Sequence, residues 1–228
     1  MSQPQSAKAS PVRTMFLVGV PLVWVVVALL HPQGDGDVYD YLNDKVGLWL
    51  GVHFAQPLLA LGVATILWIL VGGRTSPAAT VARVAIPVWL LSFAMFDSVT
   101  GLGSGLAVHH ANDLDGAEQE GAASTAEYLL DNRVTGDFSA VWFVQAAALL
   151  TAVIATALVL RSAGASRACF VAMLIGGLLV FHAGPIAAVG LVALAAAFVL
   201  ADREGLFVRS GGSPLAVQPQ QGPASPTT

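Results

Sequence analysis

The chain has 228 residues, of which 56% are hydrophobic and 11% are charged, with a mean hydropathy of +0.73. A soluble domain carries about 25% charged residues, so this composition excludes an ordinary water-soluble protein. The net charge of −4 argues against a basic nucleic-acid-binding face, and the single cysteine, Cys169, excludes an intramolecular disulfide and a cysteine metal cluster.

The first four apolar runs are each long enough to cross a bilayer. Residues 1–13 are polar and form the expected cytoplasmic N-terminal segment. No small-residue cleavage site follows the first run, so we expect a retained span and not a cleaved signal peptide. The four runs cover residues 14–31, 46–71, 84–108 and 138–160.

The last apolar stretch, residues 168–201, is too long for one span. As a single helix it would be about 50 Å long, against a hydrocarbon core of about 30 Å. Gly184-Pro185 is a turn signal in its middle. The sequence therefore predicts spans at about 168–183 and 185–201, and an all-α, polytopic transmembrane bundle of six spans over residues 14–204. An unbroken last helix would give five spans.

The basic residues predict the orientation. Only Lys45 and Arg133 fall on one side of the six-span arrangement. The other side holds Lys8, Arg13, Arg74, Arg83, Arg161, Arg167, Arg203 and Arg209. By the positive-inside rule both ends of the chain are cytoplasmic, whereas five spans would move Arg203 and Arg209 outside and weaken the bias.

The composition also suggests a compartment and the partners. The Ala, Val, Gly, Leu and Arg bias is typical of GC-rich bacteria, so we expect a bacterial plasma (inner) membrane protein. Its certain partner is the lipid bilayer, with a homo-oligomer or a second membrane protein left open. The outer loops, residues 32–45 and 109–137, are acidic, which we interpret as a solvated face in preference to a funnel for cations. A surface helix is expected over 117–132, and residues 205–228 are expected to form a disordered cytoplasmic tail.

Asp97 is the ionisable residue that stands out, because it lies inside the third apolar run. Counting from residue 108, it would be about 16 Å deep. Ionisable groups at such depth usually face the bundle interior and mark functional sites. The alternative is a neutral carboxyl that only helps helices to pack.

The histidines and two amides gather in the predicted outer half of the membrane. The histidines are His31, His53, His109, His110 and His182. Gln56 follows His53 by three residues and so shares its helix face, and Gln145 lies at a similar depth in the fourth span. We predict a site of His53, Asp97 and His182, supported by His31, Gln56 and Gln145.

Imidazoles with a carboxylate suit a transition metal ion, and paired histidines can also hold haem b. No diagnostic spacing such as H-E-x-x-H accompanies them. Two other functions therefore stay open. One is a proton-coupled transporter or channel for a small solute or cation, and the other is a non-catalytic scaffold whose polar residues fix helix packing. No nucleophile with a matched base is apparent, so we do not expect an enzyme.

Glycines and tryptophans carry two further predictions. Gly101 and Gly105, spaced i and i+4 inside a span, indicate close helix packing and not a phosphate-binding loop. Trp49 and Trp142 fall near the outer boundary, where an aromatic belt is expected.

Overall fold

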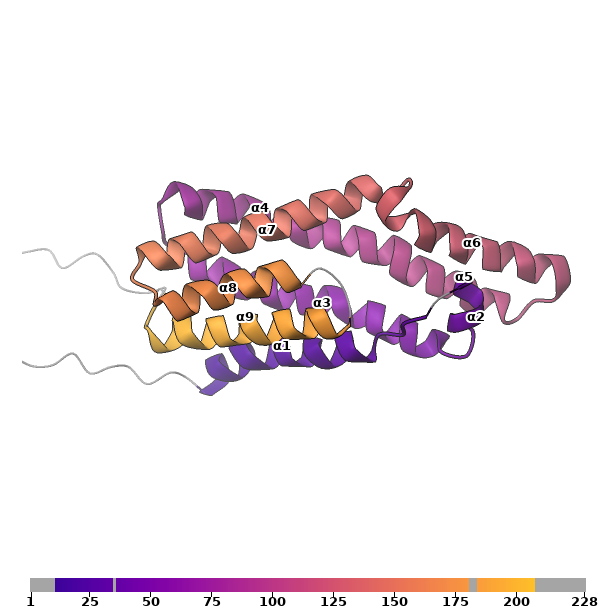
Figure 1. The fold of residues 1–228 in the computed structure, drawn as a ribbon, viewed down its shortest axis with the longest axis horizontal. Helices are drawn as coiled ribbons and strands as arrows, with labels where there is room; N and C mark the ends of the chain where they lie inside the picture. The colour runs from indigo at the N-terminus through magenta and orange to yellow at the C-terminus, as the bar shows by residue number, and fades with distance from the viewer. Residues whose placement is uncertain (1–10, 35, 181–183, 208–228) are drawn as a thin grey trace, which may run out of the picture.

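The computed structural model describes residues 11–34, 36–180 and 184–207. Every regular element in these ranges is helical, which confirms the predicted all-α class (Figure 1). In chain order the elements are α1 (Pro11–Leu30), α2 (Val38–Leu42), α3 (Val46–Val71), α4 (Pro77–Phe96), the π-helical segment η1 (Asp97–Gly103), α5 (Ser104–Ala111), α6 (Gly116–Thr135), α7 (Ser139–Ser162), α8 (Arg167–Leu179) and α9 (Pro185–Arg203).

Five helices of the described chain are long and apolar enough to cross a membrane. They are Val12–Leu30, Val46–Val71, Pro77–Ala111, Ser139–Ser162 and Pro185–Arg203. The shortest has 19 residues, about 28 Å at 1.5 Å per residue, which matches a core of about 30 Å. The protein is therefore a multi-pass membrane bundle.

The predicted break in the last apolar stretch is confirmed, because α8 ends at Leu179 and α9 begins at Pro185. The two helices pack side by side, and α9 also packs along α1. The N–H of Gly184 donates to the carbonyl of Ala28, in the last turn of α1, at 2.9 Å. Gly184 has φ = 90°, a left-handed conformation that favours glycine. However, α8 has only 13 residues, about 20 Å. The six-span count therefore depends on this short helix.

The two ends of the bundle differ in charge. Pro11 and the end of α9 lie at the same end, on the left of Figure 1, where Arg13 forms a salt bridge with Asp202. The helix ends at this end of the bundle carry Arg13, Arg74, Arg83, Arg161, Arg167 and Arg203 in or beside them, whereas Lys45 precedes α3 and Arg133 lies near the end of α6 at the other. The positive-inside rule predicts that the first end is cytoplasmic, and on that prediction we call it the inner end and the opposite one the outer end.

The outer end carries a cap made of α2, α5 and α6, which pack on one another. The predicted surface helix over 117–132 is present as α6. The cap has a small core of its own, formed by Val38, Leu42, Trp49, Val108, Ala126 and Leu130. The backbone N–H of Val38 at the start of α2 donates to Glu127 Oε2 on α6 at 2.6 Å. This outer cap closes over the region where the predicted site residues meet.

The helix Pro77–Ala111 is longer than the membrane is thick. Its 35 residues extend about 50 Å, against a core of about 30 Å. Asp97 lies 20 residues after Pro77, about 30 Å from the inner end. Because α5 also packs in the outer cap, part of this helix extends beyond the hydrocarbon core, and the depth of about 16 Å for Asp97 stays a prediction.

Candidate functional site

The centre of the site is a buried pair of His53 on α3 and Asp97 at the start of η1. The two atoms Nδ1 of His53 and Oδ1 of Asp97 are 2.7 Å apart. When Asp97 is a carboxylate it only accepts, and Nδ1 then carries the hydrogen. His53 is 3% exposed and Asp97 4%. Residues separated by 44 positions in the sequence are thus joined inside the bundle, and both belong to the set of candidate residues chosen from the sequence.

Glycine lets the two helices come this close. A Cβ added to Gly101 would lie 2.2 Å from Nδ1 of His53, so the imidazole lies directly on the backbone of η1. A Cβ added to Gly105 would lie 2.6 Å from Cδ1 of Trp49. The predicted close packing at Gly101 and Gly105 is confirmed.

The π-helical turn supplies part of the site's hydrogen bonding. The indole Nε1–H of Trp49 donates to the carbonyl of Gly101 at 2.7 Å. The same carbonyl accepts from Ser104 Oγ at 3.1 Å, and Thr100 Oγ1 donates to the carbonyl of Phe96 at 3.0 Å. Single π-helical turns inside α-helices are frequent at functional sites, because the widened turn re-aims side chains.

Three aromatic rings pack together beside the pair. The ring centroids of Trp49 and His53 are 4.3 Å apart. His31, the first residue after α1, lies 5.0 Å from His53 and 4.9 Å from Trp49 in edge-to-face contacts. Its Nδ1 is 2.8 Å from the carbonyl oxygen of Pro32 and 3.0 Å from Nε2 of Gln33. These contacts hold His31 beside His53, while its predicted role as a supporting residue of a metal site stays a prediction.

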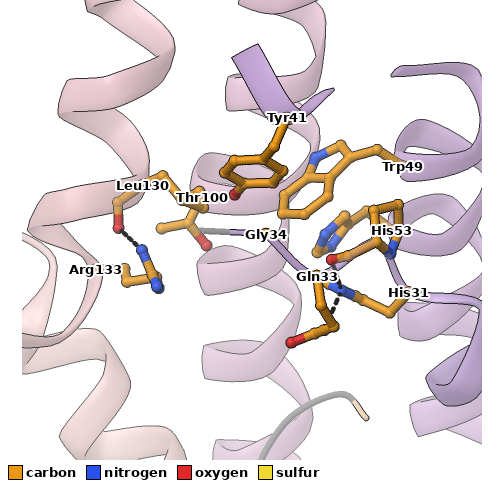
Figure 2. A pocket seen from close by; sticks show the side chains of 10 residues that line it. His31, Gln33, Gly34, Tyr41, Trp49, His53, Thr100, Leu130 and Arg133 are labelled. Carbon is orange, nitrogen blue, oxygen red and sulfur yellow. Dashed lines mark hydrogen bonds between the residues drawn. The ribbon is translucent and has the colours of Figure 1, made fainter. Parts of the chain in front are cut away.

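A pocket of about 120 Å³ opens beside these rings (Figure 2). Part of its wall, Gln33 and Gly34, is exposed, so the pocket reaches the surface at the outer end. The lining residues are His31, Pro32, Gln33, Gly34, Tyr41, Trp49, His53, Thr100, Leu130 and Arg133. Among the described residues, the lining includes one permanent cation, Arg133, and no carboxylate.

Two buried polar atoms of the central pair have no hydrogen-bond partner in the described part of the chain. They are Nε2 of His53 and Oδ2 of Asp97. His53 lines the pocket and Asp97 does not. Because Nδ1 of His53 contacts Asp97, Nε2 is the imidazole nitrogen without a partner in the described chain, a buried atom of a residue that lines the pocket.

The other predicted members differ in outcome. Gln56 and Gln145 are both buried, on α3 and α7. Oε1 of Gln145 has no hydrogen-bond partner among the described residues, so no bond to His53 or Asp97 is formed there. His182 lies outside the described residues. His109 and His110 are exposed on α5 and do not line the pocket.

The described residues contain no group of three or more His, Cys, Asp or Glu side chains that could hold a metal ion. The metal ion predicted on His53, Asp97 and His182 stays a prediction, and metal analysis of the purified protein beside a His182→Ala variant tests it. A haem is disfavoured by size. Pockets for drug-sized ligands measure about 300–1,000 Å³, whereas this one measures about 120 Å³.

The sequence analysis did not single out several lining residues. Trp49 was expected in an aromatic belt, but it is 3% exposed and packs in the site. Its position four residues before His53, on the same helix face, was an available signal. Arg133 and Tyr41 belonged to loops in the sequence and carried no such signal, because only the fold of the outer cap brings them to the pocket.

No family model matches this chain, and no curated protein or solved structure matches it. The function is therefore argued from the site.

Proposed function

We propose that this membrane protein is a proton-coupled carrier of a small polar solute. Asp97 and His53 form its protonation site, and the adjoining pocket binds the solute. The observation that carries the proposal is the buried pair, with 2.7 Å between Nδ1 and Oδ1, at the wall of a polar pocket of about 120 Å³.

A role in packing alone does not account for this pair. Burying two ionisable groups costs free energy that an apolar contact would avoid. A pair that served only packing would also be expected to satisfy its polar atoms, yet Nε2 of His53 and Oδ2 of Asp97 lack partners in the described chain. Ionisable groups in membrane bundles are typical of proton and solute pathways.

The chemistry of imidazole links proton and solute. Histidine is the side chain whose ordinary pKa lies nearest neutral pH. When His53 is neutral, Nε2 accepts a hydrogen bond, and when it is protonated, Nε2 donates one. A solute that contacts Nε2 therefore binds the two protonation states differently. By linkage, it must then change the proton affinity of the site.

Access in this conformation is from the outer end. At the inner end Arg13 pairs with Asp202, and the guanidinium of Arg74 donates to the carbonyl of Leu206 at 2.7 Å. A large apolar core fills the bundle between the two ends. Transport requires this arrangement to change. The interruptions of regular helix at η1, Pro57 and Pro87 are places where a helix can bend.

The test uses three solutes of four heavy atoms each and different charge: nitrate, urea and guanidinium. An inward gradient of each is imposed on proteoliposomes with a trapped pH dye and a clamped membrane potential. We expect at least one to move with protons. Asp97→Asn and His53→Gln should each lower that flux at least tenfold, while Asp97→Glu should retain part of it.

The matched control is His110→Gln, which changes an exposed histidine outside the pocket. It should transport as the unmodified protein does. Melting temperatures of all variants separate loss of flux from loss of fold. Absence of proton movement with all three solutes, or full flux in the folded Asp97→Asn and His53→Gln variants, contradicts the proposal.

A further inference from the structure

We infer that the pocket takes a small monovalent oxyanion, of the nitrate, bicarbonate or formate class. This inference rests on the proposed function in one respect, because His53 is taken to be the group that binds both proton and solute. It adds the charge and chemical class of the solute.

The lining of the pocket favours negative charge. Among the described residues, Arg133 on α6 is the permanent cation of the lining, and no Asp or Glu side chain is one of those that line the pocket. One guanidinium nitrogen of Arg133 donates to the carbonyl of Leu130. A guanidinium has five N–H donors, so others remain, and their fork matches the two oxygens of a carboxylate or nitrate.

Two neutral groups of the lining can also donate. Tyr41 contributes a hydroxyl and Gln33 an amide N–H to the pocket, whereas the hydroxyl of Thr100 donates to the carbonyl of Phe96. Burial raises the pKa of the Tyr41 phenol, so this side chain remains a neutral donor at physiological pH. Figure 2 shows these side chains around the space bounded by the imidazole of His53.

His53 completes the anion site when it is protonated. Its Nε2 is buried and lacks a partner among the described residues, and in the imidazolium form this nitrogen of a pocket-lining residue becomes a donor. Asp97 holds the opposite edge of the ring at 2.7 Å and does not line the pocket. The carboxylate thus stabilises the imidazolium without facing the bound anion.

Charged and titratable groups of several elements contact His53 or line its pocket. Asp97 on η1 and His31 after α1 contact the ring, and Tyr41 on α2 and Arg133 on α6 line the pocket. The acids Glu127 and Asp131 on α6 lie close enough to Tyr41 to raise its pKa, whereas Asp97 contacts His53 at Nδ1. One proton and one monovalent anion taken up together add no net charge to the site, so they can cross as a neutral pair.

The size of the pocket limits the ligand. A volume of about 120 Å³ is well below the roughly 300–1,000 Å³ of pockets for drug-sized ligands. The solute therefore has only a few heavy atoms. Nitrate, urea and guanidinium share this size and a planar shape, so a comparison among them reports the preferred charge.

The flux assay with these three probes tests the inference. We expect nitrate to move with protons at least tenfold faster than urea or guanidinium. Arg133→Gln should lower the nitrate flux at least tenfold. Lys45→Gln is the matched control, because it removes the same charge from an exposed outer-end residue that does not line the pocket.

A binding measurement separates this inference from transport. Nitrate, at constant ionic strength, should raise the melting temperature of the unmodified protein and of Lys45→Gln, but not of Arg133→Gln. Nitrate binding without flux would uphold the anion site and contradict the carrier. Proton flux with urea or guanidinium but not nitrate would overturn the anion site and uphold the carrier. If nitrate neither binds nor moves, the inference is wrong.

Discussion

Gly101 is the residue at which the backbone of η1 meets the imidazole of His53. An added Cβ would lie 2.2 Å from Nδ1 and 2.5 Å from Cγ of that ring. The ring is already held by Asp97, so it cannot move without breaking the central hydrogen bond. The absence of a side chain at this position is therefore a condition for the site.

Gly101→Ala tests this contact. We expect a lower melting temperature, with a loss of about 1–3 kcal/mol as for other overpacked positions, and loss of proton-coupled flux. Gly51→Ala on α3 is the control, because a Cβ there would meet nothing within 4 Å. It should be neutral or stabilise by about 0.5–1 kcal/mol. Unchanged stability and flux in Gly101→Ala would contradict the described contact.

The identity of the central residues was predictable, but their contact was not. Asp97 was found because a charge inside an apolar run is costly, and His53 because the histidines share one half of the membrane. Their pairing depends on which helices are neighbours and on the π-helical turn of η1. Helical periodicity in the sequence predicts neither the neighbouring helices nor this turn. The lining residues Arg133 and Tyr41 were missed for the same reason, since the outer cap brings them in.

Among the helical elements, the π-helical turn η1 is the one that the local sequence predicts least. No proline lies within Asp97–Gly103, and the apolar run there predicts a continuous span. The widened turn is instead accompanied by side-chain bonds from other positions. Trp49 and Ser104 both donate to the carbonyl of Gly101, and His53 to Asp97. Tertiary contacts of this kind can decide between an α and a π turn.

The contact between α2 and α6 gives a prediction on pH. Burial raises the pKa of the Glu127 carboxyl above its ordinary value; the Val38 N–H opposes this, and the negative charges of Asp131 and Asp37 add to it. The folded state thus binds this proton more tightly than the unfolded state. Proton binding by Glu127 therefore stabilises the fold most at pH values below the ordinary pKa. This stabilisation is lost as the pH rises through the pKa that Glu127 has in the folded state.

Glu127→Gln removes the charge and keeps an acceptor for Val38. At pH 7 we expect it to stabilise the outer cap by up to about 1 kcal/mol, and to flatten the pH dependence above about pH 4. Hydrogen exchange of the α2 amides between pH 4 and 8, corrected for intrinsic rates, measures both effects. Glu120→Gln changes the same charge at an exposed position of α6 and should leave the pH dependence intact. Equal pH profiles in the two variants would refute the role of Glu127.

For the whole molecule, the sequence predicted the helical class, the long spans and the break before Pro185, because hydropathy and Gly-Pro signals are local. It did not predict that α8 would stop after 13 residues, or that the outer cap would have its own core. Both depend on packing between distant segments. Because α8 is short, the number of spans depends on whether α8 crosses the membrane. The side of the membrane on which α9 ends decides this.

Accessibility of single cysteines decides that topology. The native Cys169 is buried, so a membrane-impermeant maleimide should not label the unmodified protein. Asp113→Cys lies at the outer end and Thr75→Cys between α3 and α4 at the inner end, and both positions are exposed. Glu204→Cys, just after α9, leaves the Lys and Arg count unchanged.

With six passages, intact cells label Asp113→Cys, while Thr75→Cys and Glu204→Cys react only after the membrane is opened. If α8 and α9 together cross only once, Glu204→Cys labels with Asp113→Cys, because an odd number of crossings puts the end of α9 on the opposite side from Pro11.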